Sequence, residues 1–97
     1  MQAALWEGER LLERRAYLAA SSALGDVFGI AGERAALVKG LHHLAAAGYR
    51  AQVGEGDRAR RQLERARRRL AAYPEAAPLV ALVASDIESA GGELAPP

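Results

Sequence analysis

The segment 33–53 is apolar on nearly every side when it is drawn as an α-helix, and this feature limits the fold more than any other. At about 100° per residue, two adjoining faces are apolar or nearly so. Their residues are Leu37, Leu41, Leu44, Gly48 and Ala51 on the first face and Val38, His42, Ala46, Tyr49 and Val53 on the second. A clear polar strip is formed only by Lys39, His43 and Arg50. A helix of this kind is normally surrounded by other helices, so we predict that it forms the centre of a bundle.

The rest of the chain is also predicted to be helical. Ala, Leu, Arg and Glu, which favour helices, dominate the composition, and β-branched residues are few. Apolar spacing, glycines and prolines place helices at 2–14, 17–28, 33–53 and 57–73, and from Pro78 to the glycines at 91–92. Asp57 is expected to begin the fourth helix. The predicted fold class is all-α: a single compact helical bundle of about five helices over residues 1–92, around a central third helix, with a frayed C-terminal tail at 93–97.

The composition excludes some classes of chemistry. The chain of 97 residues has no cysteine, so disulfides and thiolate chemistry are excluded. No apolar run approaches the roughly 20 residues of a membrane span, and the N-terminal residues lack the pattern of a secretory signal. We therefore expect a cytoplasmic protein without a membrane partner. The net charge of +1 does not by itself indicate a nucleic-acid partner.

The predicted helix 57–73 combines a narrow apolar stripe with seven arginines. The stripe consists of Ala59, Leu63, Ala66, Leu70 and Tyr73. The arginines are Arg58, Arg60, Arg61, Arg65, Arg67, Arg68 and Arg69. One interpretation is a basic surface for nucleic acid or an acidic partner. The interpretation that the sequence favours is a solvated helix in which Glu64 pairs with Arg60 and Arg68, because the arginines spread around the helix and no aromatic residue is interleaved to stack on bases.

No catalytic, metal or cofactor site is predicted. His42 and His43 are neighbours on one helix and point about 100° apart, so the two imidazoles cannot easily bind one metal ion. Positions four residues away from either histidine offer no further ligand. Ser21 and Ser22 lack the strand-to-helix elbow of a serine hydrolase. The chain contains neither a P-loop nor a dinucleotide-binding motif.

The run from Gly40 to Leu70 resembles the second half of a small all-helical microbial family, domain-of-unknown-function family 309. The family pattern has a helix with GLIQ-A-A, a Gly-Asn turn, and GA-x-x-LL at the start of a basic helix. Gly40, Leu41, Leu44 and Ala45 fit the first part, Gly54 fits the turn, and Ala59 and Leu63 fit the last part. The chain departs from the pattern at Glu55, where the family has Asn, and at Arg58, where it has Gly.

A second family motif, YFEAHExLExxW, falls on residues 17–28. Tyr17, Ala20 and Leu24 match it, and Phe28 stands for the Trp. Small residues replace the acids, at Ala19, Ser22 and Gly25, and Ser21 replaces the His. The resemblance implies a compact helical bundle and no established activity. His43 takes the place of the Gln of GLIQ, which suggests that Ser21 and His43 face each other as a buried polar pair. Drift after the loss of a site explains the same substitutions equally well.

From the sequence, the expected function is that of a non-enzymatic helical protein, either structural or a protein-interaction module. Its partner is then a second copy of the chain or another protein, because small cores often gain from association. The alternative is a nucleic-acid-associated protein that uses the arginine-rich helix 57–73. No cofactor is expected under either hypothesis.

Overall fold

The computed structural model describes the backbone of residues 2–27 and 32–94, with side chains for residues 7–27 and 32–89. Within these residues the chain forms helices and no strand. The α-helices are α1 (Gln2–Glu13), α2 (Tyr17–Gly25), α3 (Ala35–Gln52), α4 (Gly56–Leu70) and α5 (Ala77–Leu94). Short 3₁₀ segments, η2 (Gly32–Arg34) and η3 (Pro74–Ala76), precede α3 and α5. The predicted all-α fold class is confirmed.

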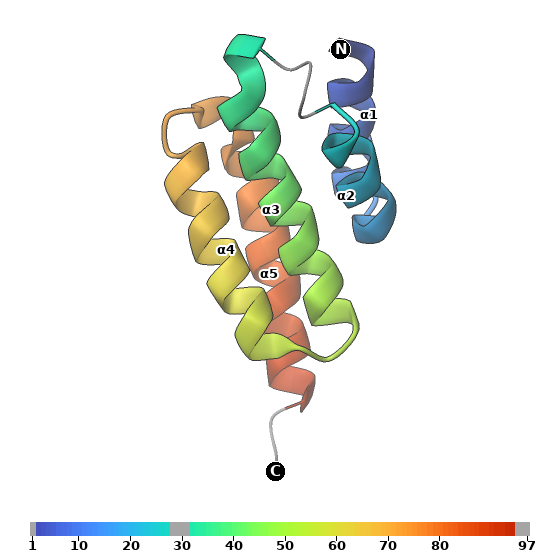
Figure 1. Ribbon diagram of the computed structural model, residues 1–97. Coiled ribbons are helices and arrows are strands. Elements are labelled where there is room, and N and C mark those ends of the chain that lie inside the picture. Colours follow the sequence, from blue (N-terminus) through green and yellow to red (C-terminus); the bar gives the residue numbers. More distant parts are fainter. Residues whose placement is uncertain (1, 28–31, 95–97) are drawn as a thin grey trace.

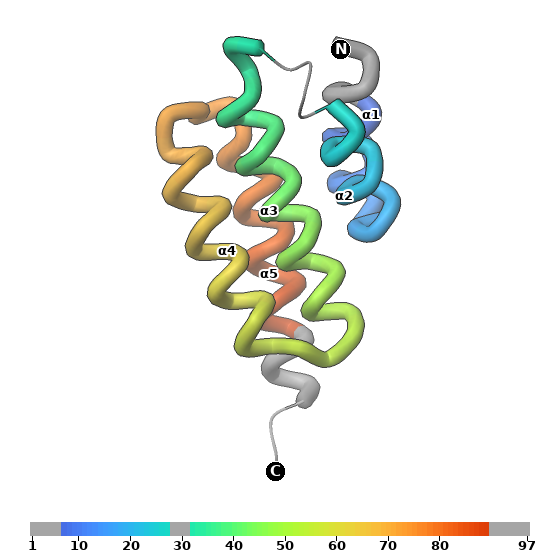
Figure 2. Tube along the Cα trace, in the orientation of Figure 1, coloured from blue at the N-terminus to red at the C-terminus, as the bar shows by residue number. Residues whose placement is uncertain are grey.

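The helices are arranged around α3. Figure 1 shows α3 and α4 side by side with α5 behind them, while α1 and α2 form a pair on the other flank of α3. The trace in Figure 2 shows that successive helices run antiparallel, as their short connections require. Because α3 packs against α2, α4 and α5, the prediction that it forms the centre of the bundle is confirmed.

The core follows the apolar spacing of the sequence. All five residues of the first apolar face of α3, from Leu37 to Ala51, are buried. The stripe on α4 is buried as predicted at Ala59, Leu63, Ala66 and Leu70. Tyr17 and Leu24 of α2 and Val83 of α5 are completely enclosed between these helices. None of the helices in the described part of the chain combines the length and apolar character that a membrane crossing requires.

Glycines let neighbouring helices approach α3 closely. A Cβ atom added at Gly48 would lie 2.5 Å from Cγ of the Tyr17 ring, and one added at Gly40 would lie 2.6 Å from a methyl group of Leu70. Both distances are too short for real atoms, so only glycine fits at these positions with the neighbours where they are. The tyrosine of α2 and the leucine of α4 therefore sit in grooves on the surface of α3.

Helix α4 begins and ends earlier than predicted. It begins at Gly56 and not at Asp57, with Glu55 as the N-cap, because Gly54 turns the chain with φ 85° and brings the next residues into the helix at once. It ends at Leu70 instead of near Tyr73, because the residue before a proline avoids helical geometry, and Tyr73 is extended with ψ 81°.

The ends of α2 and α5 also differ from the predicted ones. Helix α2 ends at Gly25. A turn is predicted from the glycines at 29–32; of these residues, Gly32 begins the 3₁₀ segment η2, while Phe28 and residues 29–31 lie outside the described part of the chain. Helix α5 continues through the two glycines to Leu94, since helical glycines lower stability without forcing an end. Glu93 and Leu94 of the predicted frayed tail are therefore helical, and residues 95–97 lie outside the described part of the chain.

Candidate functional site

The arginines of α4 divide into two groups that differ in their partners. Arg60 and Arg67 form ion pairs within the helix, with Asp57 at 3.3 Å and Glu64 at 2.8 Å. Both pairs join residues three apart. The predicted pairing of Glu64 with Arg60 and Arg68 is therefore wrong, since positions three apart are neighbours on a helix as much as positions four apart. The acids inside α4 thus neutralise the arginines of one side only.

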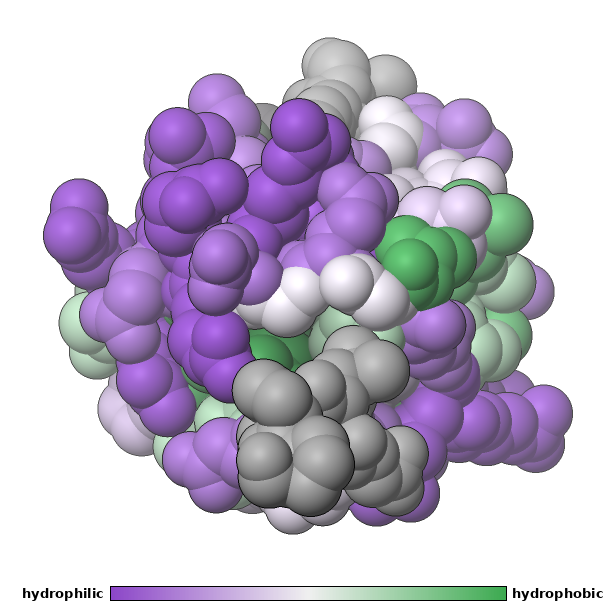
Figure 3. All heavy atoms as spheres, turned by 90° about the horizontal axis from the view of Figure 1, so that it is seen from below, coloured by the Kyte–Doolittle hydropathy of each residue, from purple (hydrophilic) through white to green (hydrophobic). Residues whose placement is uncertain are grey.

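The other arginines form a basic strip with two cations of α3. We define the basic strip as Lys39, Arg50, Arg58, Arg61, Arg65, Arg68 and Arg69. Glu55 is the carboxylate bound to this strip, at 3.3 Å from Arg50 and 3.2 Å from Arg58. The remaining five cations have no acidic partner among the described side chains. Figure 3, seen from the lower end of the bundle, shows hydrophilic residues covering the flank on which α4 lies.

Two adjoining hollows follow the strip along the junction of α3 and α4. The first is an open hollow of about 410 Å³ lined by Lys39, His43, Arg65, Arg68 and Arg69. The second is an open hollow of about 170 Å³ lined by Arg50, Arg58, Arg61, Gln62 and Arg65. Arg65 lines both, so the two are neighbours, and we call them together the basic groove.

The charge of the groove acts on His43, the ring that lines the first hollow. Partial burial lowers the pKa of His43, and the nearby positive charge of Arg69 lowers it further, together with His42, Lys39 and Arg65. The positive charges that disfavour a proton on this imidazole favour an anion in the hollow.

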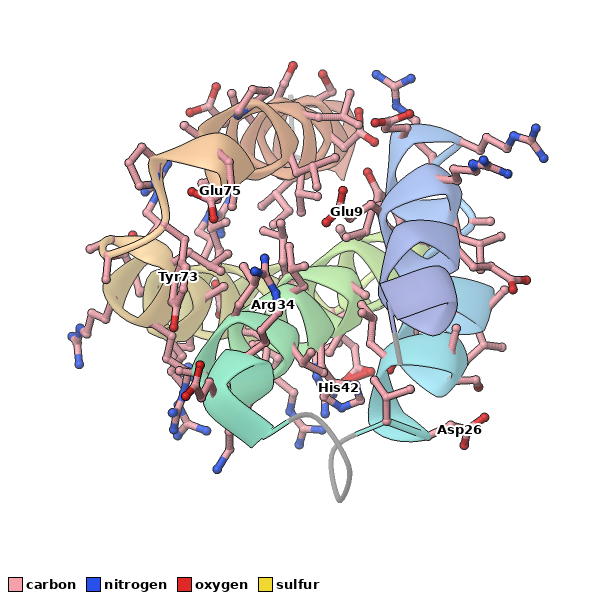
Figure 4. All side chains as sticks on the ribbon, turned by 90° about the horizontal axis from the view of Figure 1, so that it is seen from above. Glu9, Asp26, Arg34, His42, Tyr73 and Glu75 are labelled. Atoms are coloured by element: carbon pink, nitrogen blue, oxygen red, sulfur yellow. The ribbon has the colours of Figure 1, made fainter. Side chains whose placement is uncertain are left out.

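The two histidines face different helices. Nδ1 of His42 lies 3.0 Å from the main-chain oxygen of Ser21 and 3.4 Å from its Oγ, so His42 donates toward α2. Figure 4 shows His42 between α3 and α2. Nδ1 of His43 lies 2.6 Å from Nε2 of Gln62 on α4. The predicted pair of Ser21 with His43 is wrong, because neighbouring helical positions point about 100° apart and only one of them can face α2. The imidazole beside Ser21 belongs to His42, and neither ring is fully buried.

A polar cluster that the sequence did not indicate joins α2 to α5. The hydroxyl of the buried Tyr17 donates to Oδ2 of Asp86 at 2.5 Å, and Nε of Arg15 donates to the two oxygens of Asp86 at 2.8 and 3.0 Å. Arg15 has φ 60°, and its carbonyl oxygen accepts a bond from Gln52 of α3. The cluster fixes the turn between α1 and α2 against the C-terminal end of α3 and the middle of α5. The sequence offers one signal for this cluster: Asp86 is an acid directly beside Ile87, a core residue of α5.

Replacing Tyr17 with phenylalanine is expected to lower the free energy of unfolding by about 1.5 kcal/mol at neutral pH, because a hydrogen bond to a carboxylate is lost. Burial, followed by the bond to Asp86, raises the pKa of Tyr17 above its ordinary value of 10.0. In the unfolded chain this tyrosine ionises near that value, while in the folded protein it stays neutral. The wild-type advantage is therefore complete below pH 10 and falls by about 1.4 kcal/mol per pH unit above it.

Urea unfolding of both proteins at a series of pH values from neutral to strongly alkaline measures this difference. An advantage of the wild type that stays constant above pH 10 would contradict the assignment of the Tyr17 pKa. The difference in tyrosine ultraviolet absorbance between the two proteins, read in parallel, gives the ionisation of Tyr17 apart from that of the other two tyrosines.

Among the side chains that the structure describes, no three His, Asp or Glu groups converge as metal ligands do. Comparison with family models, with curated proteins and with solved structures gives no match to this chain. The resemblance to domain-of-unknown-function family 309 therefore stays a prediction, and the groove along α3 and α4 is the surface on which a function can be argued.

Proposed function

We propose that the protein is a non-enzymatic helical module that binds the phosphate backbone of nucleic acid along the basic strip. The observation that carries this proposal is the division of charge on α4. Its acids pair with Arg60 and Arg67 on one side, while Arg61, Arg65 and Arg69 on the other side have no acidic partner among the side chains that the structure describes. If the helix were only solvated and stabilised by its own ion pairs, its stability would not require unpaired arginines to be gathered on one side.

The composition and shape of the strip suit an extended polyanion such as a phosphate backbone. Six of its seven cations are arginines, whose planar guanidinium groups bind phosphate oxygens in pairs. The strip is elongated along α4, so successive charges meet an extended polyanion rather than a single ion. It contains no aromatic side chain that would stack on bases. Binding is therefore proposed to depend on the backbone and to show little sequence preference.

Salt dependence tests the proposal. The fluorescence anisotropy of a short labelled oligothymidylate is measured with the wild-type protein at increasing salt. With four or five phosphate contacts on a single strand, log K against log salt is expected to have a slope of about −3, so that affinity falls about 60-fold between roughly 50 and 200 mM salt. Absence of binding at low salt would refute the proposal.

A protein-interaction module remains the second candidate, and one observation favours it. An open hollow of about 360 Å³ between α4, η3 and α5 is lined mostly by apolar residues, among them Leu70, Tyr73 and Val80. If the protein does not bind DNA at low salt but self-associates as measured by light scattering, these results would favour this candidate.

A further inference from the structure

We propose that the first hollow of the groove holds one phosphate group of the bound polyanion, and that protonation of His43 tightens this contact, so that binding strengthens as pH falls. This inference rests on the proposed function. It adds a defined position for one phosphate group, which we call the seat, and a residue, His43, that regulates binding there. The hollow brings together one histidine ring, the side chain whose charge is most easily changed by pH, and four fixed cations, Lys39, Arg65, Arg68 and Arg69.

The hydrogen bond with Gln62 determines which nitrogen of His43 is available. The amide Nε2 of Gln62 lies 2.6 Å from Nδ1, so the amide donates and Nδ1 accepts. The proton of the neutral ring is then on Nε2 of His43, and this nitrogen has no partner among the described residues. Nε2–H is therefore the group of this ring that can donate to a phosphate oxygen.

Gln62 also allows His43 to gain a proton without losing its partner. A glutamine side chain carries both a donor and an acceptor. When Nδ1 is protonated, rotation of the amide presents its oxygen, and Nδ1–H donates to it. Nδ1 of His42 instead donates to the carbonyl oxygen of Ser21 on α2, and this ring is not among the residues that line the first hollow. The two histidines thus differ in whether they can contact an anion in the groove.

The charges that face His43 set the direction of the coupling. From α3 they are Lys39 and His42, and from α4 they are Arg65 and Arg69; no carboxylate is found among these neighbours in the described residues. In the free protein, partial burial and then these charges lower the pKa of His43 from its ordinary value of 6.5, which favours the neutral ring at pH 7. A bound phosphate reverses the local field and raises that pKa. Binding is then linked to proton uptake in the range between the free and the bound pKa values.

The pH dependence of oligothymidylate binding tests the inference, because its internal phosphodiesters and thymine bases do not titrate in the histidine range. Between about pH 8 and pH 5, the wild-type affinity is expected to rise about tenfold for a pKa difference of one unit. His43→Gln keeps a polar side chain and is expected to abolish this rise. His42→Gln, the matched control on the α2 side, is expected to retain it.

Histidine NMR with a small anion tests the seat independently of polyanion binding. The chain has only two histidines, which the two variants assign. Sulfate, which stays doubly charged in this range, is expected to raise the pKa of His43 relative to chloride at equal ionic strength.

Each outcome has a definite meaning. Affinity that does not depend on pH, or that changes equally in His43→Gln, overturns the inference while the proposed function stands. A sulfate effect on His43 without oligothymidylate binding supports the seat and overturns the proposed function. No effect of either anion on His43 overturns both the seat and its proton coupling.

Discussion

Replacing Gly48 with alanine is expected to lower the free energy of unfolding by about 2 kcal/mol, although alanine is the better helix former by about 1 kcal/mol. The added methyl group would lie 2.5–2.6 Å from three carbons at the base of the Tyr17 ring. Relief requires movement of the whole ring. That movement is opposed at the other end, where the hydroxyl of Tyr17 is bound to Asp86.

Gly25→Ala is the matched control, because a Cβ atom there meets only the His42 ring at an ordinary distance of 3.6 Å. Its effect is expected to stay within about 0.5 kcal/mol. Urea unfolding followed by circular dichroism measures both variants. In a Tyr17→Ala background, where the ring is absent, Gly48→Ala is expected to lose its destabilising effect. An equal loss of stability in both backgrounds would show that the ring contact is not the cause.

The double variant Arg65→Gln, Arg69→Gln is expected to weaken oligothymidylate binding about 100-fold at low salt. Both side chains line the first hollow, and Arg65 also lines the second. Losing two charge-assisted contacts of about 1.5 kcal/mol each corresponds to this factor. The slope of log K against log salt is expected to become shallower by about 1.4, which reflects two phosphate contacts on a single strand.

Arg60→Gln, Arg67→Gln removes the same number of charges from the same helix, and it is the control. Both of these arginines are already paired, with Asp57 and Glu64. Their replacement is expected to change affinity by no more than a few-fold. Circular dichroism checks that both proteins remain folded, since all four positions are exposed. Equal weakening by the two double variants would mean that net charge, and not the basic strip, governs binding.

The parts of the fold that could be predicted are those governed by spacing along one helix. The first apolar face of α3 and the stripe of α4 follow directly from the helical repeat. The second predicted face of α3 is buried only at Val38, and Val53 at its end is exposed. The same repeat placed His42 on an apolar face and His43 in a polar strip with Lys39, which is how the structure has them. The error was to pair Ser21 with the histidine of the polar strip and not with that of the apolar face.

Contacts between distant parts of the chain could not be predicted. Tyr17 and Asp86 are 69 positions apart, and nothing in their local sequence indicates that they meet. Gly48 indicates that a neighbouring group approaches α3 closely. Which side chain that is, here the Tyr17 ring, depends on how α2 is rotated about its own axis. The two groups of arginines on α4 likewise become distinct only when the position of α3 and the ion pairs within α4 are known.

The length of the basic strip limits how much of a nucleic acid one molecule can cover. From Arg58 to Arg69 the helix rises about 16 Å, at the ordinary 1.5 Å per residue. A strand with B-form spacing presents a phosphate about every 3.4 Å, so about five would lie against this stretch. A footprint of that size is shorter than one turn of a duplex. Coverage of a long polymer would therefore require many copies placed side by side, each with its own small share of the backbone.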